Sequence, residues 1–291
     1  MPYITVGKEN SGNIDLYYED HGSGTPVVLI HGWPLSGASW EKQVRALTDA
    51  GHRVIMYDRR GFGRSDKPMH GYDYDTLAGD LDMLLTKLNL KEVMLAGFSM
   101  GGGEVARYLG KFGSKRVKKA ALISAVTPFL LKTADNPSGV EKTVFDVIQK
   151  AIREDRPAFL TQFFAGFYNT DLYLRKRVSE EVVRLSWMIA AGASPRGTHN
   201  CVSAWQTDFR KDLAKVSIPV LIVHGDSDRI CPLEATGKPT AEIIRDSQLT
   251  VIRGGPHGLN WTHAEELNDI LEEFFSKPGT RADRMAATRT V

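Results

Sequence analysis

The sequence is poor in cysteine: Cys201 and Cys231 are the only two among its 291 residues. Two cysteines cannot form the disulfide framework of a small secreted domain. The chain also lacks CxxC and HExxH spacings, so we predict no metal site. Any chemistry must therefore come from side chains alone, and no cofactor is expected.

Charge of one sign and long hydrophobic runs are also scarce. The formal net charge is +2, and no aromatic residue interrupts the one basic cluster, Lys115, Arg116, Lys118 and Lys119. We interpret this cluster as a solvated loop and expect no nucleic-acid partner. No stretch approaches the roughly 20 apolar residues of a membrane span, so no membrane partner is expected either. Residues 1–6 lack the features of a secretory signal, which favours a cytoplasmic location.

Strand-like segments that alternate with helical patterns indicate the fold class. Four segments read as strands of a buried sheet: Val27–Ile30, Val54–Tyr57, Val93–Ala96 and Val117–Ser124. Leucines at helical spacing indicate a helix over Leu77–Leu88, and Asn13–Glu19 alternates like an edge strand. This order predicts an α/β fold with a mostly parallel central sheet flanked by helices.

The alternation breaks between residues 128 and 211. This stretch holds no comparable buried strand but many aromatic residues at helical spacing, so we predict a helical cap over 128–211. The pattern resumes with a strand at Val220–Val223, a helix from about Leu233, a strand at Leu249–Ile252 and a helix over His263–Phe275. The core is therefore predicted to comprise residues 1–127 and 212–278, followed by a disordered tail over 279–291.

Ser99 is the candidate nucleophile. It is the serine of a GxSxG pattern at residues 97–101, directly after the strand Val93–Ala96 and before a helical stretch. A strand that turns at once into a helix needs small flanking residues, and glycines supply them here. The hydroxyl then lies at a helix N-terminus, where backbone N–H groups can stabilise an oxyanion.

A base and an acid follow later in the chain. In a parallel sheet, functional residues gather at the carboxyl ends of the strands. His257 follows the last strand on a glycine-rich loop, and Asp226 and Asp228 follow Val220–Val223. Serine, aspartate and histidine in this order form the triad of an α/β hydrolase, in which the histidine takes the serine proton and the carboxylate orients the imidazole. Asp228 is the predicted acid because it reaches closer to His257, whereas Asp226 is expected to brace the loop and is the alternative acid.

Two backbone N–H groups are predicted to form an oxyanion hole. One belongs to Met100, the residue after the nucleophile, and the other to Trp33, in the loop after Val27–Ile30. The Trp33 ring can still line a substrate pocket. His31 and His224 end strands, and we expect them to make structural hydrogen bonds rather than to act as the base.

We expect the helical segment and the residues at its borders to determine which substrate binds. Phe129 and Leu130 leave a strand directly above the site, and Phe159 and Phe163 lie four residues apart on one helix face. With Ile230, they are the predicted walls of an apolar pocket. Cys231 could line the same cavity, but no base is dedicated to it, so it is not a second nucleophile.

Four motifs carry a resemblance to a known family: HGWPL at 31–35, YDRRGFGRS at 57–65, GFSMGGGEV at 97–105 and HGDSD at 224–228. Together they resemble the cofactor-free haloperoxidase and arylesterase (perhydrolase) family of α/β hydrolases. The resemblance covers most of the chain and implies the α/β-hydrolase fold and a lid of helices over an apolar acyl pocket. It further implies a serine esterase that uses Ser99, Asp228 and His257 on a small-molecule ester. Related enzymes often self-associate, so a homo-oligomer is an expectation, although the residues show no interface signal.

The resemblance also points to a second activity. Relatives that make peracids from carboxylic acids and hydrogen peroxide carry a proline after the oxyanion tryptophan, and here that residue is Pro34. A perhydrolase side activity is therefore expected.

Three alternatives to an esterase remain. A lactonase, including one that acts on acyl-homoserine lactones, would use the same triad. Epoxide hydrolases and haloalkane dehalogenases share the scaffold but need an aspartate in place of Ser99. A binding module with lost turnover would not need an intact triad.

Overall fold

Eight strands form one sheet in the computed structural model, which describes residues 2–277. Their order across the sheet is β1-β2-β4-β3-β5-β6-β7-β8. The strands are β1 (Tyr3–Glu9), β2 (Gly12–His21), β3 (Pro26–Ile30), β4 (Arg53–Tyr57), β5 (Val93–Phe98), β6 (Val117–Ile123), β7 (Val220–Gly225) and β8 (Ser247–Ile252). The pairs β1–β2 and β2–β4 are antiparallel, and all pairs from β4 to β8 are parallel. The predicted mostly parallel sheet is confirmed.

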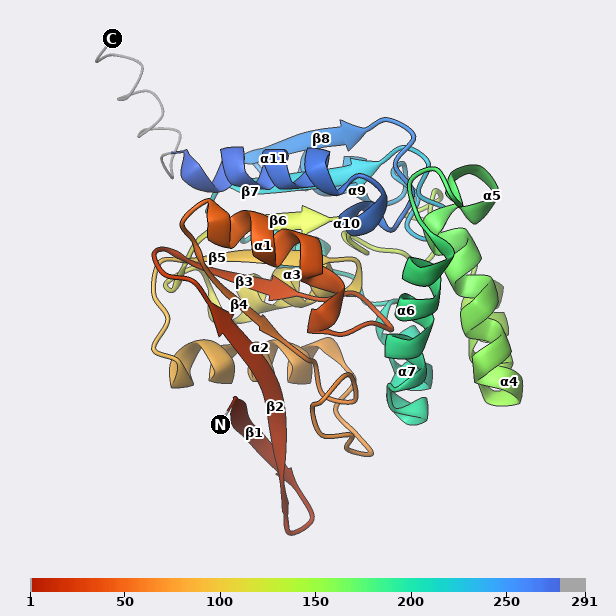
Figure 1. The fold of residues 1–291 in the computed structure, drawn as a ribbon, viewed down its shortest axis with the longest axis horizontal. Coiled ribbons are helices and arrows are strands. Elements are labelled where there is room, and N and C mark those ends of the chain that lie inside the picture. The colour runs from red at the N-terminus through yellow and green to blue at the C-terminus, as the bar shows by residue number, and fades with distance from the viewer. Residues whose placement is uncertain (1, 278–291) are drawn as a thin grey trace.

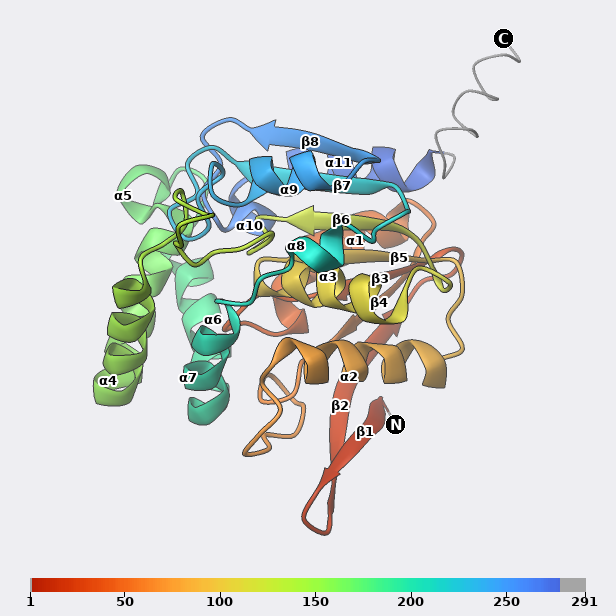
Figure 2. The ribbon, with the colours of Figure 1, turned by 180° about the vertical axis from the view of Figure 1, so that it is seen from behind.

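Helices cover both faces of this sheet, as the two opposite views show (Figures 1 and 2). On one face lie α1 (Glu41–Asp49), after the short 3-10 helix η1 (Gly37–Trp40), α10 (Leu259–Thr262) and α11 (Ala264–Ser276). On the other face lie α2 (Tyr74–Lys87), α3 (Met100–Phe112), α8 (Arg210–Leu213) and α9 (Gly237–Ile243). The fold is the three-layer α/β arrangement expected from the alternating pattern.

Alternation along the central strands fills two cores. In β3, Val28 and Ile30 belong to the apolar cluster that includes the leucines of α2. Val27 and Leu29 point the opposite way, into the cluster that contains Leu267 of α11. Because successive strand residues face opposite sides of a sheet, a strand covered by helices on both faces must be apolar throughout. This requirement explains why the central strands were visible in the sequence.

The region predicted as a helical cap contains four helices: α4 (Lys142–Tyr168), α5 (Thr170–Tyr173), α6 (Glu180–Ala191) and α7 (Pro195–Ala204). They lie beyond the carboxyl ends of the parallel strands (Figure 1). α4 is kinked where Asp155 leaves helical geometry, two residues before Pro157. Proline removes a helical hydrogen bond and crowds the preceding turn, which explains the kink. The division of the chain into core and cap stays a prediction, and the tail predicted as disordered lies outside the described residues.

Two expectations at the borders of elements were wrong, and one strand was not predicted. Asn13–Glu19 belongs to β2, which is not the edge strand, because β1 pairs along its outer side. β1 was not predicted because Ile4 is its only buried residue, so no apolar run marks the strand. α9 begins at Gly237 rather than near Leu233.

The expectation that the whole basic cluster forms a solvated loop was wrong for one residue. Lys119 is not in a solvated loop but is buried in β6, where its ammonium donates hydrogen bonds to the carbonyl oxygens of Phe274 and Phe275 near the end of α11. A cation suits this position because the carbonyls at the end of a helix carry partial negative charge.

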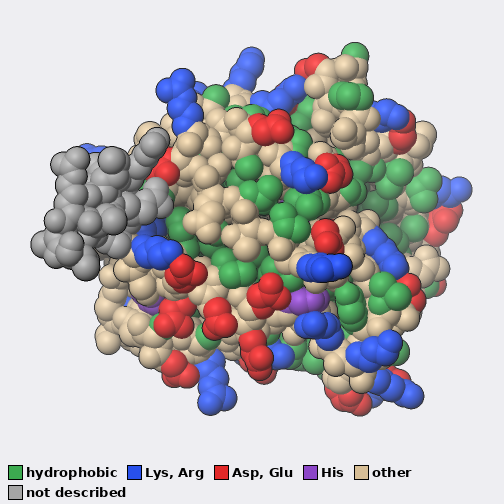
Figure 3. Space-filling model, turned by 90° about the horizontal axis from the view of Figure 1, so that it is seen from above, with side chains coloured by type: hydrophobic (Ala, Val, Ile, Leu, Met, Phe, Trp, Pro, Cys, Tyr) green, Lys and Arg blue, Asp and Glu red, His purple; other side chains and the backbone are tan. Residues whose placement is uncertain are grey.

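Charged side chains of both signs are mixed over the surface seen in Figure 3, around apolar patches. Within residues 2–277, none of the helices combines the length and the apolar character needed to cross a bilayer.

The connection between β5 and α3 is a single residue, Ser99. Its backbone has a positive φ of 55°, a conformation that costs a non-glycine residue about 1–3 kcal/mol. The turn leaves no room for side chains at two neighbouring positions. A Cβ at Gly97 would collide with the Gly101 carbonyl, and a Cβ at Gly101 would collide with the Ile30 carbonyl at the end of β3. The glycines of the GxSxG pattern are therefore a steric requirement.

Gly97→Ala should destabilise the protein by at least about 2 kcal/mol, because the added methyl group meets backbone rather than a movable side chain. Gly79→Ala is the matched control: Gly79 lies within α2 with open space where its Cβ would be, so alanine should stabilise by about 0.5–1 kcal/mol. Urea unfolding of both variants measures the difference. Equal stability of the two variants would contradict this account of the turn.

Candidate active site

Ser99, His257 and Asp228 form one hydrogen-bonded chain. Ser99 Oγ lies 2.9 Å from His257 Nε2, and His257 Nδ1 lies 2.8 Å from Asp228 Oδ2. All three residues are buried. They come from the ends of three strands, after β5, β7 and β8. The structure thus brings together the three residues that were picked from the chain order, in the geometry that activates a serine hydroxyl.

Asp228 is held as a charged group. Its Oδ1 accepts hydrogen bonds from the backbone N–H groups of Ile230 and Cys231, both at 2.8 Å. Its Oδ2 faces His257 and, at 3.4 Å, Nε2 of His224. Burial alone would raise the pKa of this carboxyl, but His257 and His224 outweigh burial and hold the pKa below its usual range. Asp228 is therefore ionised at neutral pH and can stabilise an imidazolium.

Asp226 has a different environment. It is exposed, and its Oδ1 accepts a hydrogen bond of 2.7 Å from the backbone N–H of Gly254. Gly254 opens the loop that carries His257, so Asp226 ties the two loops together. This contact matches the bracing role expected for Asp226.

The two strand-end histidines make structural hydrogen bonds, as expected. His224 Nε2 lies 2.7 Å from the carbonyl oxygen of Cys231, within the loop that carries Asp228. His31 Nε2 accepts a hydrogen bond of 3.0 Å from the backbone N–H of Arg59, and its Nδ1 lies 2.9 Å from Gly32 O. Burial, and then the nearby Arg59 cation, lower the pKa of His31 well below its usual range, so His31 is neutral.

The two predicted oxyanion donors are backbone N–H groups of buried residues. Met100 opens α3, and Trp33 follows β3 in a tight turn in which Leu35 N donates to Gly32 O at 3.0 Å. Within residues 2–277, neither the Met100 nor the Trp33 N–H has an acceptor in the protein. Buried donors without an acceptor are rare because they lose their hydration. They suit a site where an oxyanion forms during a reaction.

A cavity of about 200 Å³ opens onto Ser99. Of the predicted pocket residues, Trp33, Leu130, Phe159, Phe163 and Ile230 line it. The further lining side chains were not predicted: Val126, Val140, Val144, Phe145, Ile148, Trp205, Arg229, Cys231 and Pro232, of which Cys231 alone had been considered. The spacing of Val144 and Ile148, four residues apart on α4, was a signal for an apolar helix face, whereas Val140 lies in the loop before this helix.

Phe129 is a correction, because it does not line the cavity. Its ring lies 5.1 Å from the guanidinium carbon of Arg210. The next residue, Leu130, lines the cavity instead.

The Trp33 ring connects the loop after β3 to the helices over the cavity. It packs edge-on against Phe163 and Trp205, at centroid distances of 5.1 and 4.7 Å, and its Nε1 donates to Thr198 O of α7 at 3.1 Å. The residue whose backbone N–H is a predicted oxyanion donor therefore also places its ring in the cavity wall.

Arg229 is the one charged residue in the wall of this cavity. Its guanidinium forms two hydrogen bonds with Asp171 of α5, at 2.8 and 3.1 Å, near the surface. No group of three or more potential metal-ligating side chains exists in the described part of the chain.

Comparison with known proteins shows the family of the chain. Residues 25–264 match the family described as alpha/beta hydrolase fold. The chain belongs to this family. A putative non-heme chloroperoxidase of Synechocystis sp. is 59% identical over 274 residues, which are 94% of this chain and 99% of the relative. A bifunctional esterase/perhydrolase of Acinetobacter calcoaceticus is 38% identical, over 94% of this chain and 99% of its own length.

A solved structure agrees as well. The bromoperoxidase of Bacillus anthracis is 51% identical and superposes with a TM-score of 0.91, covering 94% of this chain and 99% of its own. These relatives place the chain beside the non-heme haloperoxidases within the α/β hydrolases, as the four motifs indicated.

Asp228→Asn should slow the labelling of Ser99 by a fluorophosphonate about 10³- to 10⁴-fold, because an amide can no longer fix the imidazole tautomer or stabilise its charged form. Asp226→Asn should change the labelling rate less than about tenfold, since Asp226 contacts only backbone and Ser227 near the site. The rate is measured by mass spectrometry of the intact protein. An equal loss in both variants would leave the acid unassigned.

Proposed function

We propose that this protein is a serine carboxylic-ester hydrolase of the arylesterase type that works through an acyl-enzyme, with a perhydrolase side activity. The observation that carries the proposal is the continuous hydrogen-bonded chain from Ser99 through His257 to Asp228 beside an apolar cavity. Ser99, His257 and Asp228 are its proposed catalytic residues, and a small-molecule ester is its proposed substrate.

Acylation follows from the positions of these groups. His257 Nε2 takes the proton of Ser99 Oγ as the oxygen attacks the ester carbonyl, and Asp228 stabilises the resulting imidazolium. The developing oxyanion accepts hydrogen bonds from the backbone N–H groups of Trp33 and Met100. When the tetrahedral intermediate collapses, His257 returns the proton to the departing alcohol and leaves the acyl group on Ser99.

Deacylation then needs a second nucleophile. Water, deprotonated by His257, releases the carboxylic acid and restores the Ser99 hydroxyl. Hydrogen peroxide in place of water releases a peroxycarboxylic acid, which can oxidise halide in solution as it returns to the carboxylic acid. This second branch is supported by the names of the relatives, which include non-heme chloroperoxidases and a bifunctional esterase/perhydrolase.

The cavity suggests the type of substrate. Its volume is about 200 Å³, and its walls are almost entirely aliphatic and aromatic. Such walls favour a small apolar acyl or aryl group, because apolar contact supplies about 25 cal/mol per Å² buried. We therefore expect short-chain aryl esters to be better substrates than long-chain or charged ones.

A substrate panel tests the proposal. The wild-type protein should hydrolyse aryl acetates and, with acetate, hydrogen peroxide and bromide, should brominate an indicator, whereas Ser99→Ala should lose both activities. Lactones belong in the same panel because a lactonase would use the same residues. Faster turnover of lactones than of aryl acetates would replace the esterase by the lactonase alternative, and activity that survives in Ser99→Ala would refute both.

Pro34→Leu tests the perhydrolase branch. Pro34 follows the oxyanion donor Trp33, and we propose that it shifts a backbone carbonyl toward the peroxide nucleophile. The variant should lower the ratio of perhydrolysis to hydrolysis several-fold while ester hydrolysis continues. Both rates are measured on the same preparation, and an unchanged ratio would exclude this role of Pro34.

A further inference from the structure

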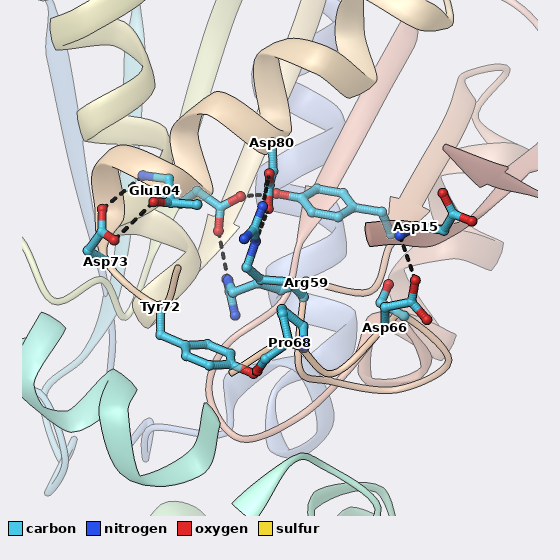
Figure 4. A network of polar contacts seen from close by, with 12 residues as sticks. Asp15, Arg59, Asp66, Pro68, Tyr72, Asp73, Asp80 and Glu104 are labelled. Atoms are coloured by element: carbon cyan, nitrogen blue, oxygen red, sulfur yellow. Dashed lines mark hydrogen bonds and ion pairs between the residues drawn. The ribbon is translucent and has the colours of Figure 1, made fainter. Parts of the chain in front are cut away.

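A buried ion pair lies next to the loop after β3 that carries Trp33, which is called the oxyanion loop below. Arg59, in the loop after β4, donates through Nε to Glu104 Oε2 at 2.8 Å, and both side chains are only 1% exposed (Figure 4). Glu104 lies in α3, five residues after Ser99, and also accepts a hydrogen bond from the hydroxyl of Tyr57. The catalytic mechanism proposed above uses none of these side chains.

Arg59 also holds the loop that carries Trp33. Its Nη2 donates to the carbonyl oxygen of His31 at 2.8 Å, and its backbone N–H donates to Nε2 of the same histidine at 3.0 Å. Because Nε2 accepts a hydrogen bond, the ring proton of the neutral His31 is on Nδ1. This Nδ1–H donates to Gly32 O at 2.9 Å.

The Gly32 carbonyl is the link to the oxyanion hole. Gly32 C=O and Trp33 N–H belong to the same planar peptide group, in which they point in opposite directions. Hydrogen bonds that His31 Nδ1 and Leu35 N donate to Gly32 O therefore set the direction of the Trp33 N–H.

We propose that Arg59 and Glu104 are positioning residues that fix the orientation of the Trp33 N–H relative to Ser99. The ion pair connects α3, which begins directly after Ser99 and carries the Met100 donor, to the loop that carries the second donor. The inference rests on the proposed function, because the orientation of the donor matters only if an oxyanion forms at Ser99.

The cost of this arrangement supports the interpretation. Two charges removed from water gain little or no net stability over well-packed apolar side chains, so stability alone does not account for the pair. Arginine is required for geometric reasons, because its planar fork reaches Glu104 and the His31 carbonyl at the same time, whereas a lysine ammonium on a flexible stem does not fix both acceptors.

The next residue offers a matched control. Arg60 forms an ion pair with Asp80 of α2 in which Nε and Nη2 each donate at 2.6 Å, and this pair is also buried. Within the described residues it makes no hydrogen bond to the oxyanion loop or to α3. Arg60→Lys and Arg59→Lys therefore make the same change in adjacent, similarly buried ion pairs, and only Arg59→Lys affects the oxyanion loop.

Arg59→Lys should lower kcat for aryl acetate hydrolysis about 10- to 100-fold with little change in KM, because the misaligned donor binds the transition state rather than the substrate. Inhibition by a phenylboronic acid, which forms a tetrahedral adduct with the serine, should weaken by the same factor. Arg60→Lys should keep kcat and boronate inhibition within about threefold of wild type. Equal effects in the two variants would overturn the inference.

The double variant Arg59→Met/Glu104→Leu covers a failure of Arg59→Lys to fold. It removes both charges together, so the folded protein should be retained while kcat stays low. Recovery of wild-type kcat in the folded double variant would show that the pair is structural only, and would overturn the inference. Absence of Ser99-dependent hydrolysis in the wild-type protein would instead refute the proposed function, so the two failures are distinguishable.

Discussion

Ser99 is held in a left-handed backbone conformation at the one point where β5 becomes α3, and the arrangement of the whole site depends on this turn. The turn brings the start of α3 so close to β3 that only a hydrogen atom fits between Gly101 and the Ile30 carbonyl. The loop that leaves β3 must therefore begin directly beside the first turn of α3. This contact brings the loop that carries Trp33 close to Met100, which lies 67 positions further along the chain (100 − 33).

The proposed acid Asp228 and the proposed base His257 lie on a second pair of loops, after β7 and β8. These strands are parallel neighbours, so the loops leave the same edge of the sheet. Asp226 and Asp228 share the first loop but have separate tasks, since Asp226 bonds to the backbone of the second loop and Asp228 bonds to the imidazole. Because Asp226 and Asp228 are two residues apart, their side chains reach different partners. One loop can therefore both bond to the neighbouring loop and orient the proposed base.

The sheet and the three hydrogen-bonded residues were predictable because they follow local rules. Strands buried on both faces are apolar throughout, and strand ends gather at one edge, so the GxSxG motif and the order of elements together indicated Ser99, Asp228 and His257. The walls of the cavity were less predictable. Val144 and Ile148 have the spacing of an ordinary core-facing helix, and Phe129 and Leu130 are adjacent apolar residues of which only Leu130 lines the cavity. Whether an apolar side chain faces a cavity or a core depends on contacts between distant segments.

The Arg59–Glu104 pair shows a related limit. Both residues lie in motifs that were quoted for their resemblance, but no spacing rule indicates that a loop after β4 and a helix after β5 meet behind β3. The contact arises because β3 lies between β4 and β5 in the sheet, an order that differs from the order in the sequence. As a consequence, two separate sets of contacts position Trp33. Hydrogen bonds from Arg59 to His31 and from His31 to Gly32 O fix its peptide group, and Phe163 and Trp205 pack against its ring. Under the proposed function, Trp33 therefore links the wall of the cavity to the proposed oxyanion donor.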